Sequence, residues 1–600
     1  MIKLSDYIFE YLVERQDVRQ CFLVTGGGAM HLDDSIGKAK GLAYVCHHHE
    51  QAAAIAAEAY ARTADKMAIV CVTSGPGATN AITGCLCAWE GSIPMIIISG
   101  NVRTALTVRA QNLPLRFNGT QEYDICRSVE AMTKYSVQIS DPSTIRYHLE
   151  KACYLAKAGR PGPVWLDLPL DMQAAMINPD QQVAFDSAKE GYQAPLIAKA
   201  DIKEIVERIK QAERPVLLCG WGVRAAGAYE LLSEFIDRLG IPVITTYSTL
   251  DCISADHRYY SGRPGVIGDR AGNFAMQNSD LVLSIGSRLN YTLIGYETDN
   301  WAPNAYKIMV DIDESELKRG YLHIDRLIQA DAGDFIQAMH VELEQHPLLE
   351  HTDWVEQCHK WTEQYPVVLD EYRTMPDGKG SLYLFYDELS RQLSDDAIVV
   401  TSAGTARTVG RQVLRLKGNQ RMIANPNVAP MGYCLPAAIG ASYAAIGKPI
   451  ICVTGEGGFQ MNLQELQTIK HNNLPIHIFV INNEGYHSIR MTQKSFFKDH
   501  SFIGVGEDSG DLSFPDIRKI ADAYGFPYFE SKNQGDLQKC ISASLSCASF
   551  SMTQIFVSPT QGVAPKVSAK QTEDGKFVSA SLDDMAPFLS KEELANNRMK

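Results

Sequence analysis

The sequence predicts an α/β protein made of three doubly wound parallel-sheet domains. Short apolar runs alternate with helical periodicity along most of the chain, which is typical of strands buried on both faces of a parallel sheet. A length of 600 residues exceeds what one hydrophobic core supports and indicates several domains. Glycine clusters follow several of the runs, at the strand ends where ligands of open α/β sheets bind.

The composition limits the classes of partner and compartment. A net charge of −14 argues against a nucleic-acid partner, because phosphates require a basic surface. No apolar run approaches the ~18 residues of a membrane span, so we expect no membrane partner. The fourteen cysteines are scattered, form no CxxC motif and often lie inside apolar runs, which is typical of the reducing cytoplasm.

The first domain is expected over residues 1–171, with strands at 21–25, 67–73, 95–99 and 164–168. Gly28 ends a glycine loop that lets the backbone approach a flat ligand. Glu50 begins an Ala-rich helix and is a candidate acid–base group, although a helix N-terminus also suits an ordinary surface glutamate. The preceding histidines, residues 47–49, are adjacent and cannot converge on one metal, so we expect them to fill the helix start and the core edge.

The second domain is expected over residues 199–344, after a polar linker at 172–198, with strands at 215–219, 243–245, 281–285 and 307–310. The third is expected over residues 379–565, with strands at 399–402, 450–454 and 476–481 and a helix at 462–471. A charged tail occupies residues 566–600 and ends in a short helical pattern. Its only expected role is to cover or cross a neighbouring element.

A carboxylate and a carboxamide follow neighbouring strands of the third domain. Glu456 comes after the first of these strands and Asn483 after the second, about one βαβ crossover apart. Mg²⁺ prefers oxygen ligands and usually takes few of them from the protein. We therefore predict a Mg²⁺ held by Glu456, the Asn483 side chain and a backbone carbonyl near Gly485, with a diphosphate and a water completing the shell. The alternative is an ordinary βαβ turn without a ligand.

The segment from Gly455 to Gly485 resembles the diphosphate motif of thiamine diphosphate (ThDP) enzymes, in which Gly-Asp-Gly is followed by Asn-Asn. This chain has Glu456 where that family usually has Asp, and the extra methylene puts the metal affinity and choice in question. His49, Glu50 and Gln51 are similar to the activating-glutamate motif of the acetolactate synthase type, and residues 73–80 match its Thr-Ser-Gly-Pro-Gly-x-x-Asn loop.

The resemblance implies a role for each matched residue. The catalytic residues would be Glu50, which hydrogen-bonds the cofactor's aminopyrimidine, and Gln121. The ThDP-binding residues would be Gly28, Pro76, Asn80, Gly404, Thr405, Met431, Gly455, Gly457 and Gly458. Without the resemblance, Met431 would be interpreted as a core methionine. The first and third domains would then bind the pyrimidine and the diphosphate.

In acetolactate synthases the central domain holds FAD, whereas relatives hold ADP or nothing. The residues matching the FAD positions are Arg160, Gly220, Gly222, Gly286, Arg288, Asp311, Glu316 and Asp331. Glycines at strand ends also suit any Rossmann-like domain, so all three alternatives stay open. Chemically, Asp311 suits a ribose hydroxyl and Arg288 a phosphate.

The implied activity is decarboxylation of a 2-oxo acid, such as pyruvate, followed by carboligation to a carbonyl acceptor in a homodimer or homotetramer. Thr120, Thr292 and Thr492 replace a Phe, an Arg and a Trp of anabolic acetolactate synthases, which favours a larger or more polar acceptor. Both chain ends resemble a branch associated with surface-polysaccharide sugars, so a nucleotide-linked keto sugar is a second candidate acceptor. A non-catalytic relative that keeps the fold is the remaining alternative.

Overall fold

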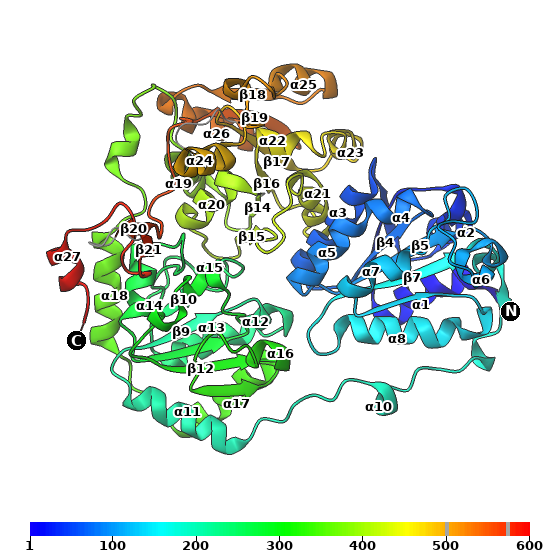
Figure 1. The fold of residues 1–600 in the computed structure, drawn as a ribbon, viewed down its shortest axis with the longest axis horizontal. Helices are drawn as coiled ribbons and strands as arrows, with labels where there is room; N and C mark the ends of the chain where they lie inside the picture. Colours follow the sequence, from blue (N-terminus) through cyan, green and yellow to red (C-terminus); the bar gives the residue numbers. More distant parts are fainter. Residues whose placement is uncertain (402, 498–502, 572–576, 600) are drawn as a thin grey trace.

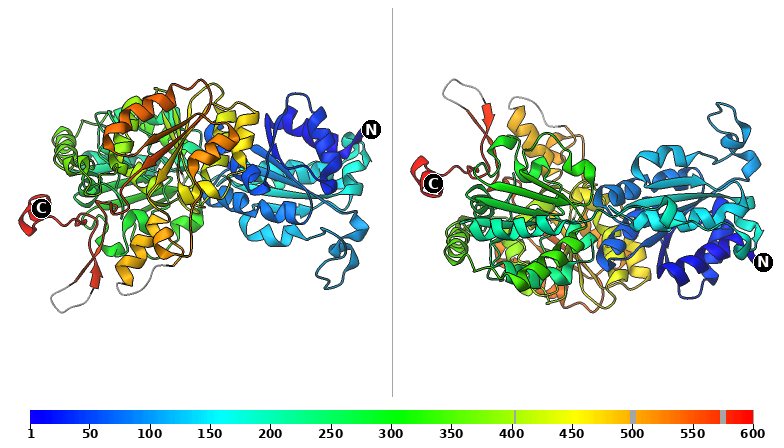
Figure 2. Two further views of the ribbon diagram at one scale, coloured as in Figure 1. Left: turned by 90° about the horizontal axis from the view of Figure 1, so that it is seen from above. Right: turned by 90° about the horizontal axis from the view of Figure 1, so that it is seen from below.

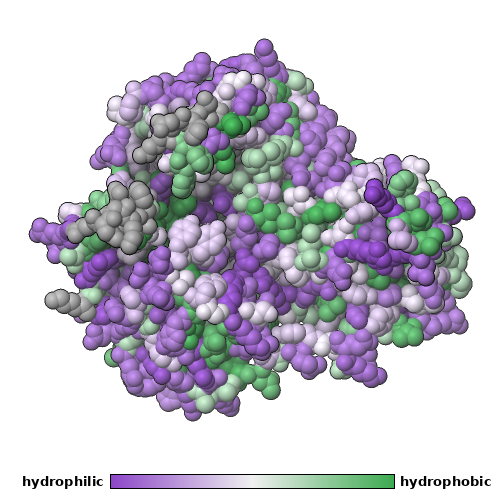
Figure 3. Space-filling view, in the orientation of Figure 1, coloured by the Kyte–Doolittle hydropathy of each residue, from purple (hydrophilic) through white to green (hydrophobic). Residues whose placement is uncertain are grey.

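The computed structural model describes residues 1–401, 403–497, 503–571 and 577–599 and contains three α/β domains (Figure 1). Ser402, which the sequence places at a strand end, and tail residues 572–576 and 600 lie outside the described residues. Within the described ranges, no helix combines the length and apolar character needed to cross a membrane. Hydrophilic residues cover most of the face in Figure 3, and apolar patches gather where the third domain meets the first.

The first domain contains a six-stranded parallel sheet of order β3-β2-β4-β5-β7-β6. The four predicted strands are confirmed as its interior, and the two edge strands, which the sequence analysis missed, lie outside them. The strands are β2 (Gln20–Leu23), β3 (Ala43–Cys46), β4 (Ala68–Val72), β5 (Met95–Asn101), β6 (Tyr135–Gln138) and β7 (Pro163–Pro169). The main helices are α1 (Leu4–Gln16), α3 (Glu50–Ala64), α5 (Ile82–Gly91) and α8 (Ile145–Lys157).

The second domain has a five-stranded parallel sheet of order β10-β9-β11-β12-β13. All four predicted strands are confirmed: β9 (Pro215–Cys219), β10 (Val243–Thr245), β11 (Leu281–Ile285) and β12 (Tyr306–Asp311), with β13 (Arg326–Gln329) added at the edge. A long connection carrying the short helix α10 (Ser187–Glu190) brings the chain here from the first domain (Figure 1).

The third domain has a six-stranded parallel sheet of order β15-β14-β16-β17-β19-β18. Its strands are β14 (Ile398–Thr401), β15 (Arg421–Ile423), β16 (Ile450–Gly455), β17 (Ile476–Asn482), β18 (Tyr528–Ser531) and β19 (Ser551–Phe556). The prediction of one helix over 462–471 is wrong in its extent. The structure has α22 (Glu456–Gln460), a turn at 461–464 and then α23 (Glu465–His471), because Asn462 uses its side chain to hold the Gly432 carbonyl.

The first and third domains meet through two helices packed almost backbone to backbone. Helix α3 lies against α21 (Cys434–Ala444); both are rich in alanine, and α21 contains one glycine, Gly440. A Cβ on Gly440 would lie 2.0 Å from the carbonyl oxygen of Ala56, so only glycine fits there. The two views of Figure 2 show the first domain attached to the side of the third at this junction.

The C-terminal tail covers the central domain, as the prediction of a covering role anticipated. Lys566 and Ala586 exchange backbone hydrogen bonds, and Val567 donates to the Val266 carbonyl at 2.7 Å. Helix α27 (Lys591–Asn596) ends at Asn597, whose side-chain oxygen accepts a hydrogen bond of 2.7 Å from the indole of Trp361. Trp361 belongs to α18 (Thr352–Gln364), so the tail fastens onto the helix that precedes the third domain.

Candidate functional site

Glu456 and Asn483 lie at the same edge of the third sheet. Strands β16 and β17 are parallel neighbours in which Gly455 is paired with Ile481, so both strands end at the same level. Glu456 is 3% exposed and Asn483 is 5% exposed. The Asn483 side chain donates to the Thr405 hydroxyl at 3.1 Å, which leaves its amide oxygen available to a ligand. The sequence pattern therefore brings the two polar side chains to one buried place.

The Glu456 carboxyl has the properties expected of a group that binds a cation. Its Oε2 atom is buried without a hydrogen-bond partner among the described residues. Burial raises the pKa of Glu456 to about 8, although the Gly485 N–H and the charge of Arg490 oppose that rise. A bound cation would compensate this buried carboxylate, so the oxygen donors at this position fit a hard metal ion. Within the described ranges, no three His, Cys, Asp or Glu side chains gather as a metal cluster, so a metal here would depend on neutral oxygens and phosphate as well.

Glycines shape the backbone around this carboxyl group. Gly485 has φ +123°, and a Cβ there would lie 1.9 Å from the Val505 carbonyl oxygen. The ring of Tyr486 occupies the space beside Gly457, where a Cβ would meet it at 2.0 Å. Gly455 has open space at its Cα, and Gly458 is half-buried within α22.

Three further predicted cofactor residues lie in the third domain. Gly404, with φ +73°, begins helix α20 (Gly404–Val413), and Thr405 follows it beside Asn483. Met431 is 42% exposed, which contradicts its interpretation as a core methionine. An exposed methionine is available to contact a bound ring.

In the first domain, Glu50 is brought together with the loop that follows β4. The Asn80 side chain donates to the Glu50 carboxylate at 3.0 Å. A Cβ on Gly77 would lie 3.5 Å from Glu50 Oε1, so the loop backbone passes directly beside the carboxylate. Pro76, at the start of the short helix α4 (Pro76–Asn80), and Asn80 are exposed.

Gly28 and Gln121 border the same loop. The Gly28 N–H donates to the Thr73 hydroxyl at 3.1 Å, and a Cβ on Gly28 would lie 2.7 Å from Ser74 Oγ. A Cβ on Gly75 would lie 2.6 Å from the Gln121 carbonyl oxygen. Gln121 itself has φ +60° and is exposed. The five residues that the sequence assigned to this site therefore share one surface of the first domain.

The three histidines before Glu50 diverge, as predicted from their spacing. His47 is buried and its Nδ1 lies 2.8 Å from a carboxylate oxygen of Glu465 in the third domain. His48 is exposed, and the Nδ1 of His49 accepts the Gln51 N–H at the start of α3. The buried pair joins the segment just before α3, the helix that begins at Glu50, to α23, which lies within the diphosphate motif. Sequence inspection missed this pair because its partners are far apart in the chain.

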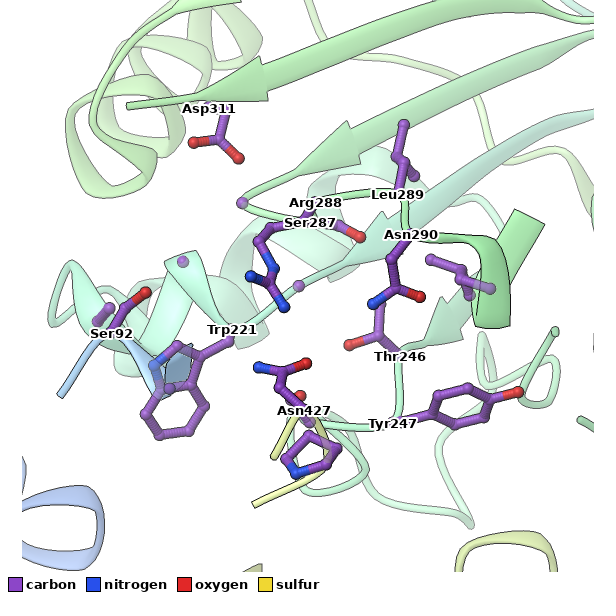
Figure 4. A pocket seen from close by; sticks show the side chains of 18 of the residues that line it. Ser92, Trp221, Thr246, Tyr247, Ser287, Arg288, Leu289, Asn290, Asp311 and Asn427 are labelled. Atoms are coloured by element: carbon purple, nitrogen blue, oxygen red, sulfur yellow. The ribbon is translucent and has the colours of Figure 1, made fainter. Parts of the chain in front are cut away.

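A cavity of about 430 Å³ lies where the three domains meet. It is lined by seven residues predicted for a nucleotide: Arg160, Gly220, Gly222, Gly286, Arg288, Asp311 and Asp331. The three glycines form a close crossing in which a Cβ on Gly220 would lie 2.2 Å from the Gly286 carbonyl oxygen. Figure 4 shows Arg288 reaching into the space between Trp221 and Asn290, with Asp311 at the strand end above them.

The cavity is charged at several points. Arg288 pairs with Glu90 at 3.3 Å, and Arg160 pairs with Asp313 at 3.0 Å and Glu316 at 2.8 Å. Burial raises the pKa of Asp311, as expected for a carboxyl group that lacks a strong cationic partner. The size is within the usual range for small-molecule sites, and paired positive groups beside a buried acid suit a nucleotide.

Three family models match the chain in order. The N-terminal TPP binding domain of thiamine pyrophosphate enzymes matches residues 2–125, the central domain 202–339 and the C-terminal TPP binding domain 402–555. The acetolactate synthase isozyme 3 large subunit of Escherichia coli (strain K12) is 30% identical over 557 residues, covering 91% of this chain and 92% of that protein.

The chain belongs to the acetolactate synthase-like family of thiamine pyrophosphate enzymes.

Two other relatives in this family are similarly distant. The isozyme 2 large subunit of Escherichia coli (strain K12) is 29% identical over 565 residues, covering 93% of this chain and 96% of that protein. The acetolactate synthase large subunit of Lactococcus lactis subsp. lactis (strain IL1403) is 27% identical over 548 residues and covers 91% of both chains. The resemblance predicted from the motifs is therefore confirmed, together with the α/β fold.

The structure also shows residues of this thiamine pyrophosphate enzyme that sequence inspection missed. Arg490 donates to the Asn483 carbonyl at 3.0 Å and so fixes the loop between the proposed metal ligands. It lies in the first turn of helix α24 (His487–Phe496), seven residues after Asn483, and that spacing is its only local signal. Arg407 and Arg411, on α20, line the central cavity from the third domain. Nothing in their immediate sequence indicates that they face another domain.

Proposed function

We propose that this enzyme decarboxylates a 2-oxo acid, pyruvate in the first instance, and joins the acyl unit to a carbonyl acceptor. The observation that carries the proposal is the meeting of Glu456 and Asn483 at one sheet edge, with an unpartnered carboxylate oxygen facing it. Glu456, Asn483 and the backbone at Gly485 would hold Mg²⁺ and, through it, the cofactor's diphosphate. ThDP supplies a nucleophilic carbon and an electron sink for the decarboxylation.

The chain's own residues have distinct tasks in this proposal. Glu50 exchanges a proton with the aminopyrimidine, and Asn80 holds its carboxylate in place through the 3.0 Å hydrogen bond. Gly77 lets the backbone pass beside that carboxylate, and Met431 offers an exposed apolar side chain to the cofactor rings. Gln121 contributes a carboxamide at the same surface.

The exposure of these groups supports a homo-oligomeric site. Pro76, Asn80 and Gln121 are exposed, and Glu50 is partly exposed. We infer a homodimer or homotetramer in which the Glu50 surface of one subunit faces the Glu456 site of another. The cysteines are mostly buried, and none of those in the described residues forms a disulfide, which favours a reducing compartment, the cytoplasm.

We also propose that the central cavity binds a nucleotide, either FAD or ADP. The glycine crossing at Gly220 and Gly286 leaves room for a ligand backbone, and Asp311 and Arg288 have the chemistry for a ribose and a phosphate. Arg160 reaches the same cavity from the first domain.

A second acceptor, a nucleotide-linked keto sugar, is favoured by one group of observations. Thr120 and Thr492 are exposed, and the Thr492 hydroxyl is already bonded to the Ser488 carbonyl at 3.0 Å. Thr292 lines the central cavity with its hydroxyl 2.5 Å from Asn290. None of the three adds bulk or charge where a large acceptor would enter.

Titration of the full chain with ThDP, with and without Mg²⁺, tests the cofactor assignment. Pyruvate consumption is then measured alone, with a second 2-oxo acid and with a nucleotide-linked keto sugar. Glu50→Gln should bind ThDP normally and lose about 100-fold or more of the turnover. Glu10→Gln, an exposed change on α1, is the matched control. Full activity in Glu50→Gln would refute the assignment, and ThDP binding without pyruvate consumption would favour the non-catalytic alternative.

A further inference from the structure

Helix α20 connects the proposed diphosphate site to the central cavity. Its first turn contains Thr405, whose hydroxyl accepts the Asn483 side chain. Arg407 and Arg411 follow on the face that lines the cavity. They are four residues apart and therefore neighbours on one helix face, close enough for one anion to contact both. The far end of the helix is held by Arg263 of the central domain, which donates to the carbonyls of Arg411 at 2.6 Å and Leu414 at 2.5 Å.

These two arginines lack compensating charge in the part of the chain that the structure describes. Arg411 is 6% exposed, and the Nε atoms of both arginines are buried without a hydrogen-bond partner. Arg407 donates to the Pro426 carbonyl at 3.0 Å, and the Arg411 guanidinium lies 3.7 Å from the centre of the Tyr247 ring. Neither forms an ion pair with any described carboxylate.

Burial lowers the pKa of both groups, that of Arg407 to about 9 with the Arg411 charge as the second cause. A guanidinium group nevertheless stays protonated at neutral pH, so both side chains carry a positive charge. The other arginines of the cavity differ, because Arg160 and Arg288 have carboxylate partners within 3.3 Å. Two adjacent charges, one buried and one half-buried, destabilise a fold when no counter-ion is near, so their presence in a cavity wall indicates a ligand that supplies the counter-charge.

We propose that Arg407 and Arg411 form an anion subsite of the central cavity, which binds a phosphate or carboxylate group of the cavity's ligand. This proposal rests on the proposed nucleotide function for the identity of the ligand, but not for the existence of the anion subsite. The third domain contributes this subsite. The subsite would therefore contact a different part of the ligand from the part that meets the glycine crossing and Arg288 of the central domain.

The position of the subsite on α20 gives it a second effect. An anion that bridges Arg407 and Arg411 fixes the helix whose first turn places Thr405 against Asn483. Occupancy of the cavity should therefore strengthen ThDP binding, and ThDP should strengthen binding in the cavity by the same factor.

The experiment uses the full chain and three probes: inorganic pyrophosphate, ADP and FAD. Binding is measured by calorimetry and by the change in tryptophan fluorescence, to which Trp221 in the cavity wall contributes. Arg411→Gln and Arg407→Gln should each weaken ADP or FAD binding about 10- to 100-fold, as expected for a buried charge-assisted contact. Arg415→Gln is the matched control, because Arg415 follows the same helix but pairs with Asp256 at the surface. It should change binding less than about twofold.

Thermal unfolding separates ligand binding from a structural role. Removing an uncompensated buried charge should leave the Tm of the ligand-free Arg411→Gln protein equal to or above that of the wild type, while the Tm increase produced by the bound probe falls. A lower Tm without ligand, together with an unchanged probe-induced increase, would assign Arg411 to packing on Tyr247 and overturn the proposal.

The three probes separate this proposal from the nucleotide proposal. If ADP or FAD binds and depends on Arg288 but not on Arg407 or Arg411, the cavity binds a nucleotide and the subsite is refuted. If only pyrophosphate binds, in a manner that requires Arg407 and Arg411, the subsite is supported and the nucleotide is refuted. If none of the three probes binds the wild type, both the anion subsite and the nucleotide proposal are refuted.

Discussion

Glu456→Gln should remove a pH-dependent instability of the ligand-free enzyme. Burial raises the pKa of Glu456 from 4.5 to about 8. The stability associated with its neutral form is fully present below pH 4.5 and is lost as the pH rises through about 8. At about 1.4 kcal/mol per pH unit, keeping this carboxyl protonated in the folded protein while the unfolded chain ionises it costs on the order of 4 kcal/mol of stability at a pH of about 7.5. A glutamine of nearly the same shape has no such cost.

The assay is urea unfolding of ligand-free wild type and Glu456→Gln across pH 5 to 9. The free energy of unfolding should fall with pH more steeply in the wild type, and Mg²⁺ with ThDP should restore stability only there. Glu484→Gln is the matched control, because Glu484 is on the same loop with its side chain 54% exposed. Identical pH slopes in wild type and Glu456→Gln, or equal protection of both by Mg²⁺ and ThDP, would refute the reasoning.

Two further substitutions test how the first and third domains are joined. Gly440→Ala places a Cβ 2.0 Å from the Ala56 carbonyl and should lower the unfolding free energy by about 1–3 kcal/mol, measured by urea unfolding. Gly320→Ala, which meets no atom within 4 Å, should change it little, and equal effects would show that the helices part easily. Glu465→Gln weakens the buried contact with His47 and should cost about 1–3 kcal/mol in the same assay. Unchanged stability there would mean that the pair contributes nothing across the junction.

Most interior strands of the three sheets could be predicted because they are continuous apolar runs, although β19, an interior strand of the third sheet, was not. Strand β11 (Leu281–Ile285), for example, is buried at every position. Most edge strands lack that signal and were missed, as in β3, where only Val45 is buried. The edge strand β10, which is buried at every position, was predicted.

The buried strand β19 alternates apolar and polar residues. Its Ser551 hydroxyl is bonded to His477 and Ser544, whereas the Thr553 hydroxyl is buried without a hydrogen-bond partner among the described residues. Local composition therefore did not identify β19 as a strand, and its conformation depends on burial in the tertiary structure.

The glycine motifs predicted where the candidate sites lie. They did not predict which charged side chains from other domains surround those sites. The motifs predicted that Glu456 and Asn483 lie together, because the carboxyl ends of neighbouring parallel strands lie at the same edge of the sheet. The environment of Arg411 could not be predicted, since its cavity is formed by residues from all three domains. The pairing of His47 with Glu465 likewise depends on how α3 lies on α21. Such contacts follow from domain packing, which carries no local sequence pattern.

The contact between Ala56 and Gly440 restricts how the enzyme moves during turnover. The two backbones are in direct contact at this position, so no side chain separates the helices there and could adjust if they moved. Closely packed surfaces of this kind have few intermediate arrangements, so a hinge between the first and third domains would have to break the junction instead of flexing it. Access for substrates should therefore be controlled by surface segments such as residues 104–119, whose Leu113 and Phe117 are exposed. Structures with and without ligand should superpose across both domains as one rigid body.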